Sequence, residues 1–234
     1  MKASIVIPTY NERLNICLLI KKIITFLKKN FEIIVIDDNS PDKTAKEVKE
    51  CFKNKKEIKV FVRKKERDLG SAILFGIKKA KGEIIVGMDA DFNHPPELLP
   101  KLIKETKKFD FVVTSRFIKG GGMEDKIRYF FTFIFNFFLK NFLGFPTMDN
   151  MSGFYAIKKE KLNLLPLKKI YYGYGEYHLR LVWYAKKMDF KIKEIPVFYP
   201  KRKFGKSKSN LFRMFFKYIT VVVFLKLNDK NRKF

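Results

Sequence analysis

Five short runs of aliphatic and aromatic residues, separated by longer segments, most constrain the fold of this 234-residue chain. The runs occupy residues 3–7, 32–36, 58–62, 83–88 and 110–114. Their continuous apolar character predicts strands that are buried on both faces, and the segments between them are long enough for crossover helices. We therefore predict an α/β fold in which a mostly parallel, doubly wound sheet carries helices on both faces.

Polar residues follow these predicted strands at the points where the strands end. The runs in question are residues 8–12 (PTYNE), 37–42 (DDNSPD), 89–94 (DADFNH) and 115–116 (SR). Crossovers between parallel strands are right-handed, so ligands bind beyond the carboxyl ends of the strands. Carboxylates that converge there repel one another unless a cation or hydrogen-bond donors compensate their charge. A divalent cation would provide that compensation.

The pair Asp89 and Asp91 is the central feature of these strand ends. Alternate residues that leave a strand diverge, so one carboxylate can coordinate a cation while the other meets a ribose or the water shell of the cation. Asn93 offers a further oxygen ligand. Such hard oxygen donors suit Mg²⁺ or Mn²⁺.

The charge balance points to anionic partners. Lysine and arginine total 50 against 24 acidic residues, which leaves a net charge of +26. This excess is typical of proteins that bind nucleic acid, an anionic membrane face or phosphorylated substrates, although a lysine-rich composition alone could also produce it. The sequence contains no nucleic-acid recognition motif, so a basic nucleic-acid-binding protein is the weakest of these interpretations. The two cysteines, Cys17 and Cys51, are too few for a framework of several disulfides and favour a reducing compartment such as the cytosol.

Two basic aromatic segments predict helices that contact a membrane surface. Residues 126–143 combine Lys126, Arg128 and Lys140 with a run of phenylalanines, and residues 211–227 flank apolar runs with basic side chains. Both apolar runs are shorter than the roughly 20 residues that span a bilayer, so we predict no transmembrane span. An interfacial helix is favoured for 126–143, whereas 211–227 could equally cover the sheet. We expect one domain over residues 1–210 and a basic amphipathic helix and tail over 211–234.

Seven motifs, in order along residues 3 to about 210, resemble family 2 glycosyltransferases of the GT-A fold, and among them the dolichyl-phosphate (polyprenyl-phosphate) mannose synthases. They are IVIPTYNE (5–12), VIDDNSPDKT (35–44), MDADFNHPPE (88–97), TSRFIKGGG (114–122), DNMSGFYAIKKE (149–160), EIPVFY (194–199) and RKFGKSK (202–208). The resemblance implies the Rossmann-like GT-A sheet and a metal-dependent glycosyltransferase.

The resemblance also implies roles for individual residues. The nucleotide-sugar positions are Pro8, Tyr10, Glu12, Val35, Asp37, Asp89, Ala90, Arg202 and Lys208. The metal positions are Asp89, Asp91 and Asn93, and those for the acceptor phosphate are Arg116, Arg128, Thr132 and Asn136. Asp91, Arg116 and Arg128 are the expected catalytic residues. Basic groups there would balance the charge of the diphosphate leaving group and of the acceptor phosphate.

The implied reaction transfers a single sugar, mannose from GDP-mannose, to dolichyl or polyprenyl phosphate with inversion at the anomeric carbon. A phosphate acceptor is already ionised near neutral pH, so it needs positioning rather than a general base. The enzyme would be peripheral on the cytosolic face of the membrane, held by its basic aromatic helices or by a membrane-anchoring subunit. Many relatives carry Phe-Gln-x-Glu where this chain has Tyr177-His178-Leu179-Arg180, so a UDP-hexose or UDP-N-acetylhexosamine donor is the alternative.

Overall fold

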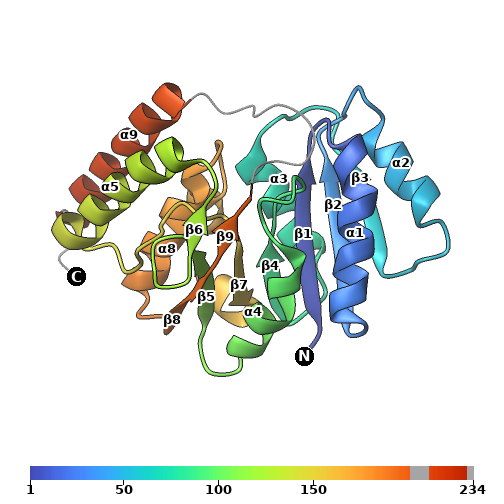
Figure 1. Cartoon of the computed structure of the whole chain (residues 1–234), viewed down its shortest axis with the longest axis horizontal. Coiled ribbons are helices and arrows are strands. Elements are labelled where there is room, and N and C mark those ends of the chain that lie inside the picture. The colour runs from blue at the N-terminus through green and yellow to red at the C-terminus, as the bar shows by residue number, and fades with distance from the viewer. Residues whose placement is uncertain (201–210, 231–234) are drawn as a thin grey trace.

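The fold is a seven-stranded sheet with helices on both faces, seen in a computed structural model that describes residues 1–200 and 211–230 and the side chains of 1–200 and 215–227 (Figure 1). The strand order is β3-β2-β1-β4-β7-β5-β8. The strands are β1 (Ala3–Thr9), β2 (Phe31–Asp37), β3 (Ile58–Val62), β4 (Ile84–Gly87), β5 (Phe111–Ser115), β7 (Tyr155–Lys158) and β8 (Ile192–Pro196). Strands β6 (Gly122–Met123) and β9 (Phe198–Tyr199) form a second, two-stranded sheet.

The predicted strands are confirmed, each within two residues of its expected ends. Strand β7 is the exception to the parallel pattern, because it lies antiparallel between β4 and β5. Strands β1, β2, β3 and β4 pair in parallel, and β5 pairs in parallel with β8. Since β1 has β2 on one side and β4 on the other, the strand order reverses at β1. Ligands of doubly wound sheets bind at such a point.

Alternating side chains of the strands pack against helices on opposite faces. Ile5, Ile7 and Ile33 belong to one buried cluster that includes α1 and α4, whereas Val6 and Ile34 belong to another that includes α3 and α8. The helices and the 3₁₀ turn are α1 (Arg13–Leu27), α2 (Thr44–Cys51), α3 (Leu69–Lys79), η1 (Pro96–Leu98), α4 (Leu99–Glu105), α5 (Lys126–Leu143), α6 (Lys159–Leu162), α7 (Leu167–Ile170), α8 (Glu176–Lys187) and α9 (Leu211–Lys230).

Helices α5 and α9 lie side by side at the end of the molecule away from α2 (Figure 1). The carboxylate of Asp125 accepts a hydrogen bond from the backbone N–H of Arg128 and caps the start of α5, and Gly144 ends it with a left-handed φ of 68°. The rings of Phe135 and Phe215 meet at 5.5 Å between the two helices. A buried cluster joins both helices to α8; its members are Leu139, Phe145, Leu179, Trp183, Tyr218, Val222 and Leu225.

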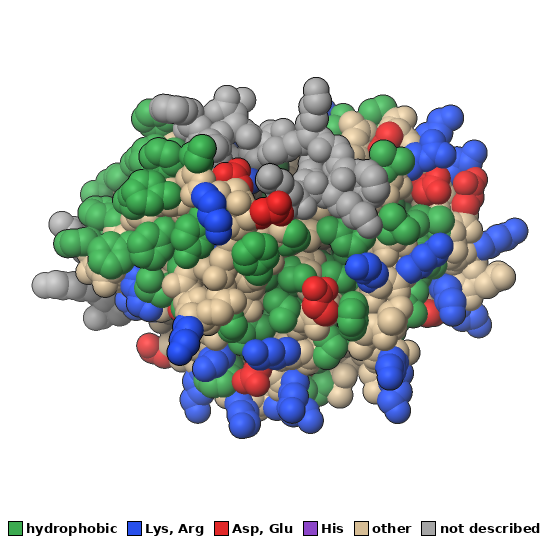
Figure 2. Space-filling view, viewed as in Figure 1, with side chains coloured by type: hydrophobic (Ala, Val, Ile, Leu, Met, Phe, Trp, Pro, Cys, Tyr) green, Lys and Arg blue, Asp and Glu red, His purple; other side chains and the backbone are tan. Residues whose placement is uncertain are grey.

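The outer faces of α5 and α9 are not covered by any other part of the chain that the structure describes. Their exposed apolar side chains are Ile127, Phe130, Phe131, Ile134, Phe137, Phe138 and Phe142 on α5 and Phe215, Phe216, Ile219, Val223, Phe224 and Leu227 on α9. We call these residues the apolar face. Figure 2 shows hydrophobic side chains gathered over this end of the molecule. None of the described helices combines the length and the apolar character needed to cross a bilayer.

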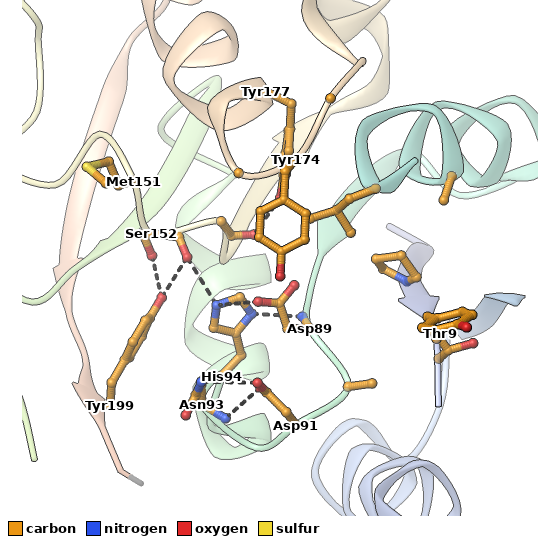
Figure 3. Close-up of a pocket in the computed structure, with 18 of the residues that line it drawn as sticks. Thr9, Asp89, Asp91, Asn93, His94, Met151, Ser152, Tyr174, Tyr177 and Tyr199 are labelled. Carbon is orange, nitrogen blue, oxygen red and sulfur yellow. Dashed lines mark hydrogen bonds and ion pairs between the residues drawn. The ribbon is translucent and has the colours of Figure 1, made fainter. Parts of the chain in front are cut away.

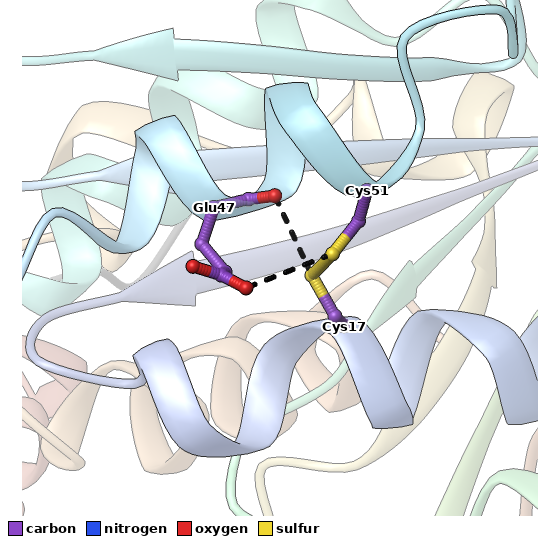
Figure 4. Close-up of side chains that lie close together, drawn as sticks. All are labelled: Cys17, Glu47 and Cys51. Atoms are coloured by element: carbon purple, nitrogen blue, oxygen red, sulfur yellow. Dashed lines mark hydrogen bonds between the residues drawn. A yellow bond between two sulfur atoms is a disulfide. The ribbon is translucent and has the colours of Figure 1, made fainter.

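A disulfide between Cys17 and Cys51 joins α1 to α2 (Figure 4). The two cysteines are 34 positions apart in the sequence. The low cysteine count excluded a framework of several disulfides and favoured a reducing compartment. This single pair forms because α1 and α2 pack side by side, which the number and spacing of the cysteines do not indicate. The side chain and backbone of Glu47 lie beside the two sulfur atoms.

Candidate active site

A cavity of about 670 Å³ opens at the carboxyl ends of β1 and β4, where the strand order reverses. Its walls come from the loop after β1, the loop after β4, the end of β5, the Tyr171–Gly175 loop, and the helices α5 and α9. We call it the central pocket. Its position agrees with the place at which the sequence predicted a ligand site.

Asp89 and Asp91 both line the central pocket from the loop after β4. Asp91 is buried, and its carboxylate accepts hydrogen bonds from the backbone N–H of Asn93 at 3.2 Å and from the Asn93 side-chain amide at 3.1 Å (Figure 3). The Asp89 side chain is 42% exposed. The structure therefore brings the three predicted metal-binding residues together, with Asn93 turned toward Asp91.

His94 fixes the shape of this acidic loop. Its Nδ1 accepts a hydrogen bond from the backbone N–H of Asp89 at 2.8 Å, so Nε2 carries the ring proton and donates it to the carbonyl of Ser152 at 3.1 Å. The ring stacks on Phe154 with centroids 4.9 Å apart. Both ring nitrogens are engaged by backbone groups, so His94 shapes the turn.

Arg116 lies at the end of β5 and is held by Asp149. Its Nε and Nη2 donate to the two carboxylate oxygens of Asp149 at 2.7 and 2.8 Å, and both side chains are buried. Burial alone would raise the pKa of Asp149, but the charge and hydrogen bonds of Arg116 hold that pKa below its usual value. The guanidinium also lies over the Tyr199 ring at 5.1 Å. Arg116 thus reaches the pocket wall in one fixed orientation.

The nucleotide positions are only partly gathered at the pocket. Pro8, Tyr10, Glu12 and Ala90 line it, and the guanidinium of Arg67 lies 3.5 Å from the centre of the Tyr10 ring. The structure does not bring Val35 or Asp37 to the pocket surface. Val35 is in the core, and the buried carboxylate of Asp37 accepts hydrogen bonds from Thr9 and Ser40.

The predicted acceptor residues on α5 also separate into two groups. Arg128 and Thr132 line the pocket. Asn136 is fully buried, and its side-chain oxygen accepts hydrogen bonds from the backbone and side chain of Asn150. Asn136 therefore joins α5 to the 147–151 loop and does not face the pocket.

The predicted donor-phosphate residues Arg202 and Lys208 lie outside the described residues. Several residues that line the pocket were given no site role from the sequence; they include Arg67, Ser152, Tyr174, Tyr177, Tyr199 and Lys217. The tyrosine-rich stretch at 171–174 was the one sequence signal that could have drawn attention to that wall of the pocket.

Solved structures with the same fold include glucosyl-3-phosphoglycerate synthase from Mycobacterium tuberculosis. In its complex with Mn²⁺, uridine diphosphate and glucosyl-3-phosphoglycerate, the TM-score is 0.71 at 18% identity, over 97% of this chain and 79% of that one. This likeness confirms the predicted fold class.

Curated relatives are closer in sequence. The chain is 36% identical, over 89% of its length, to the dolichol-phosphate mannosyltransferase of Pyrococcus furiosus, and 34% identical, over 68%, to that of Saccharomyces cerevisiae. It spans 59% and 61% of the length of these two relatives. It is also 27% identical to the undecaprenyl-phosphate mannosyltransferase of Micrococcus luteus, over 89% of this chain and 87% of that protein.

The family comparison extends over most of the sheet and the pocket. The sequence pattern described as glycosyl transferase family 2 matches residues 4–165, which contain Asp89, Asp91, Arg116 and Arg128. The chain therefore belongs to glycosyl transferase family 2.

Proposed function

We propose that this chain transfers one sugar from a nucleotide donor to a polyprenyl or dolichyl phosphate. The observation that carries the proposal is that one pocket joins the acidic pair Asp89 and Asp91 to the cationic side chains Arg116 and Arg128. The carboxylates can bind a divalent cation that in turn binds the diphosphate of a sugar nucleotide. The basic side chains can form charge-assisted hydrogen bonds to an acceptor that is itself a phosphate. The named activities of the curated relatives support the same reaction class.

The residues present fit a divalent cation of the Mg²⁺ or Mn²⁺ type. Asp89 and Asp91 offer carboxylate oxygens in one pocket, and the amide of Asn93 lies beside Asp91. Such cations are commonly bound by one or two carboxylates, with substrate phosphates and water as the remaining ligands. A cation held there would balance the charge of the departing diphosphate.

The groups around the pocket favour an acceptor that needs no deprotonation. Asp149 is bound to Arg116, and both ring nitrogens of His94 contact backbone groups. His178 is buried and does not line the pocket. A phosphate monoester is already ionised near neutral pH, so Arg116 and Arg128 have only to hold it in line with the anomeric carbon. The phosphate oxygen then forms the new bond as the bond to the diphosphate breaks, with inversion.

The donor we propose is GDP-mannose, with Pro8, Tyr10 and Glu12 against the nucleotide and Ala90 near its ribose and diphosphate. A UDP-hexose or UDP-N-acetylhexosamine is the alternative donor. Arg202 and Lys208 are proposed to contact the donor phosphates. The apolar face of α5 and α9 supports a peripheral position on the cytosolic membrane face, where basic side chains meet anionic lipid.

The decisive experiment offers the protein a panel of radiolabelled nucleotide sugars together with a short polyprenyl phosphate and Mn²⁺. We expect mannose from GDP-mannose to enter the organic phase and Asp91→Asn to abolish this transfer while the circular dichroism spectrum stays unchanged. Asp189→Asn is the matched control, because Asp189 is an exposed turn residue with φ 52°, a conformation that asparagine also accepts. Label from a UDP-sugar alone would favour the alternative donor, and no labelled lipid from any donor would refute the proposal.

A further inference from the structure

Two cations line the central pocket on its α5 and α9 side. Arg128 on α5 and Lys217 on α9 both line the pocket, and neither forms an ion pair with any side chain that the structure describes. The Nε of Arg128 is buried and has no hydrogen-bond partner among those residues. A buried guanidinium nitrogen without a hydrogen-bond acceptor has a desolvation cost in free energy. An anionic ligand that accepts a hydrogen bond from this nitrogen would remove that cost.

Arg116 provides the contrast within the same pocket. Its guanidinium is already bonded to both oxygens of Asp149, so much of its charge is balanced by the protein. The nearest acid along α5 is Asp125, whose carboxylate caps the helix through the backbone N–H of Arg128 and makes no ion pair with its guanidinium. The positive charge available to a ligand at this end of the pocket therefore comes from Arg128 and Lys217.

The packing of α9 makes the position of Lys217 definite. Its neighbour Tyr218 is buried against α5, with its ring 6.2 Å from that of Phe135, and also lines the pocket. On the other side of Lys217, Phe216 is 62% exposed and belongs to the apolar face. Lys217 thus lies at the boundary between the apolar face and the pocket, where the head group of a lipid-linked phosphate would enter.

We propose that Lys217 joins Arg128 in a subsite for the phosphate monoester of the acceptor, and that α9 is thereby part of the substrate site rather than a covering helix alone. The inference rests on the proposed function for the identity of the acceptor as a lipid. Its chemistry, a dianionic phosphate held between a guanidinium and an ammonium, is the same for a soluble phosphate ester.

The test compares Lys217→Gln with Lys226→Gln. Lys226 lies on the same helix, over the Trp183 ring at 5.1 Å and outside the central pocket, so its loss removes an equal charge from membrane attraction. Binding is measured by calorimetry with farnesyl phosphate in detergent and, separately, with glycerol 3-phosphate. Transfer is measured with the short polyprenyl phosphate and the donor that the wild type uses.

We expect Lys217→Gln to weaken farnesyl phosphate binding roughly 10- to 100-fold and to raise the KM for the lipid acceptor with the KM for the donor unchanged. Lys217→Arg should retain most of the affinity, and Lys226→Gln should change it less than about threefold.

Equal effects of Lys217→Gln and Lys226→Gln on binding would overturn the subsite. If the wild type binds the phosphates through Lys217 but transfers no sugar, the proposed function fails while the subsite stands. Binding of glycerol 3-phosphate as tight as that of farnesyl phosphate would show that the subsite recognises the phosphate without the lipid.

Discussion

Asp149 holds Arg116 through two parallel hydrogen bonds of 2.7 and 2.8 Å, in surroundings where neither side chain is more than 4% exposed. Removing one partner of such a pair leaves a buried charge without compensation. We therefore expect Asp149→Asn to lower the free energy of unfolding by about 3–5 kcal/mol, as measured by urea denaturation.

The double variant Arg116→Met, Asp149→Leu separates structure from function. Because it removes both charges, it should recover part of the lost stability. Recovery is incomplete because the backbone N–H groups of Arg116 and Met151 lose their acceptor on Asp149. It should still fail to transfer sugar, since Arg116, one of the cations that line the pocket, is gone. Wild-type stability in Asp149→Asn would contradict the buried ion pair, and full activity in the double variant would remove Arg116 from the proposed site.

Part of this site could be predicted because it depends on where strands end. Asp89, Asp91 and Arg116 follow buried strands directly, and the carboxyl ends of parallel strands meet at one edge of the sheet. The strands themselves were predictable because buried parallel strands have continuous apolar sequences.

Other positions depend on local conformation and on packing between distant segments, which no periodic pattern reports. Asp37 also ends a strand, but the loop after it turns through Asn39, with φ 53°, and its carboxylate bonds to Thr9 and Ser40 instead of facing the pocket. The spacing of Arg128, Thr132 and Asn136 predicts that they share one face of α5. Asn136 is nevertheless buried, because its side-chain oxygen accepts a hydrogen bond from Asn150 in the loop that follows α5. Lys217 reaches the pocket only because α9 packs on α5 and α8.

The apolar face should bind anionic membranes. Phe130, Phe131 and Phe138 are each at least 48% exposed, so replacing them by serine should leave the fold intact and weaken binding to anionic liposomes by roughly tenfold for each residue. Co-sedimentation with liposomes measures the effect. The control is the serine replacement of Leu14, Leu18 and Phe26, which are exposed on α1. Equal retention of both triple variants on liposomes would show that α5 does not contact the membrane.

His178 should make the protein sensitive to mild acid. Burial lowers the pKa of His178 to about 4, although its hydrogen bond to the carbonyl of Asn150 opposes the shift. In the unfolded chain His178 has a pKa of about 6.5, so between pH 6.5 and pH 4 the unfolded chain binds a proton at His178 that the folded protein does not. The free energy of unfolding is therefore highest above pH 6.5 and falls as the pH is lowered from 6.5 to 4. The loss should reach about 3 kcal/mol at pH 4.

The variant His178→Gln tests this dependence, since glutamine is neutral throughout the range. The difference between the unfolding free energies of the two proteins, followed from pH 8 to pH 4, isolates His178 because all other groups titrate in both. We expect the wild type to lose stability more steeply below pH 6.5. Parallel curves would mean that the folded protein protonates His178 as readily as the unfolded chain does.

The disulfide between Cys17 and Cys51 should stabilise the half of the molecule that carries the loops proposed to bind the nucleotide. It closes a loop with a sequence separation of 34, for which the loss of chain entropy in the unfolded state corresponds to about 4 kcal/mol. Reduction should therefore lower the urea midpoint of the wild type, whereas the double variant Cys17→Ser, Cys51→Ser should unfold at one midpoint with or without reductant.

The loops that lead into α1 and α2 are also joined by hydrogen bonds. The backbone N–H of Glu12 donates to the hydroxyl of Thr44, and that of Asn11 donates to the hydroxyl of Ser40. Because these bonds do not involve sulfur, nucleotide binding at low temperature should survive reduction even as stability falls. Equal midpoints for the oxidised and reduced wild type would contradict a stabilising role for the disulfide.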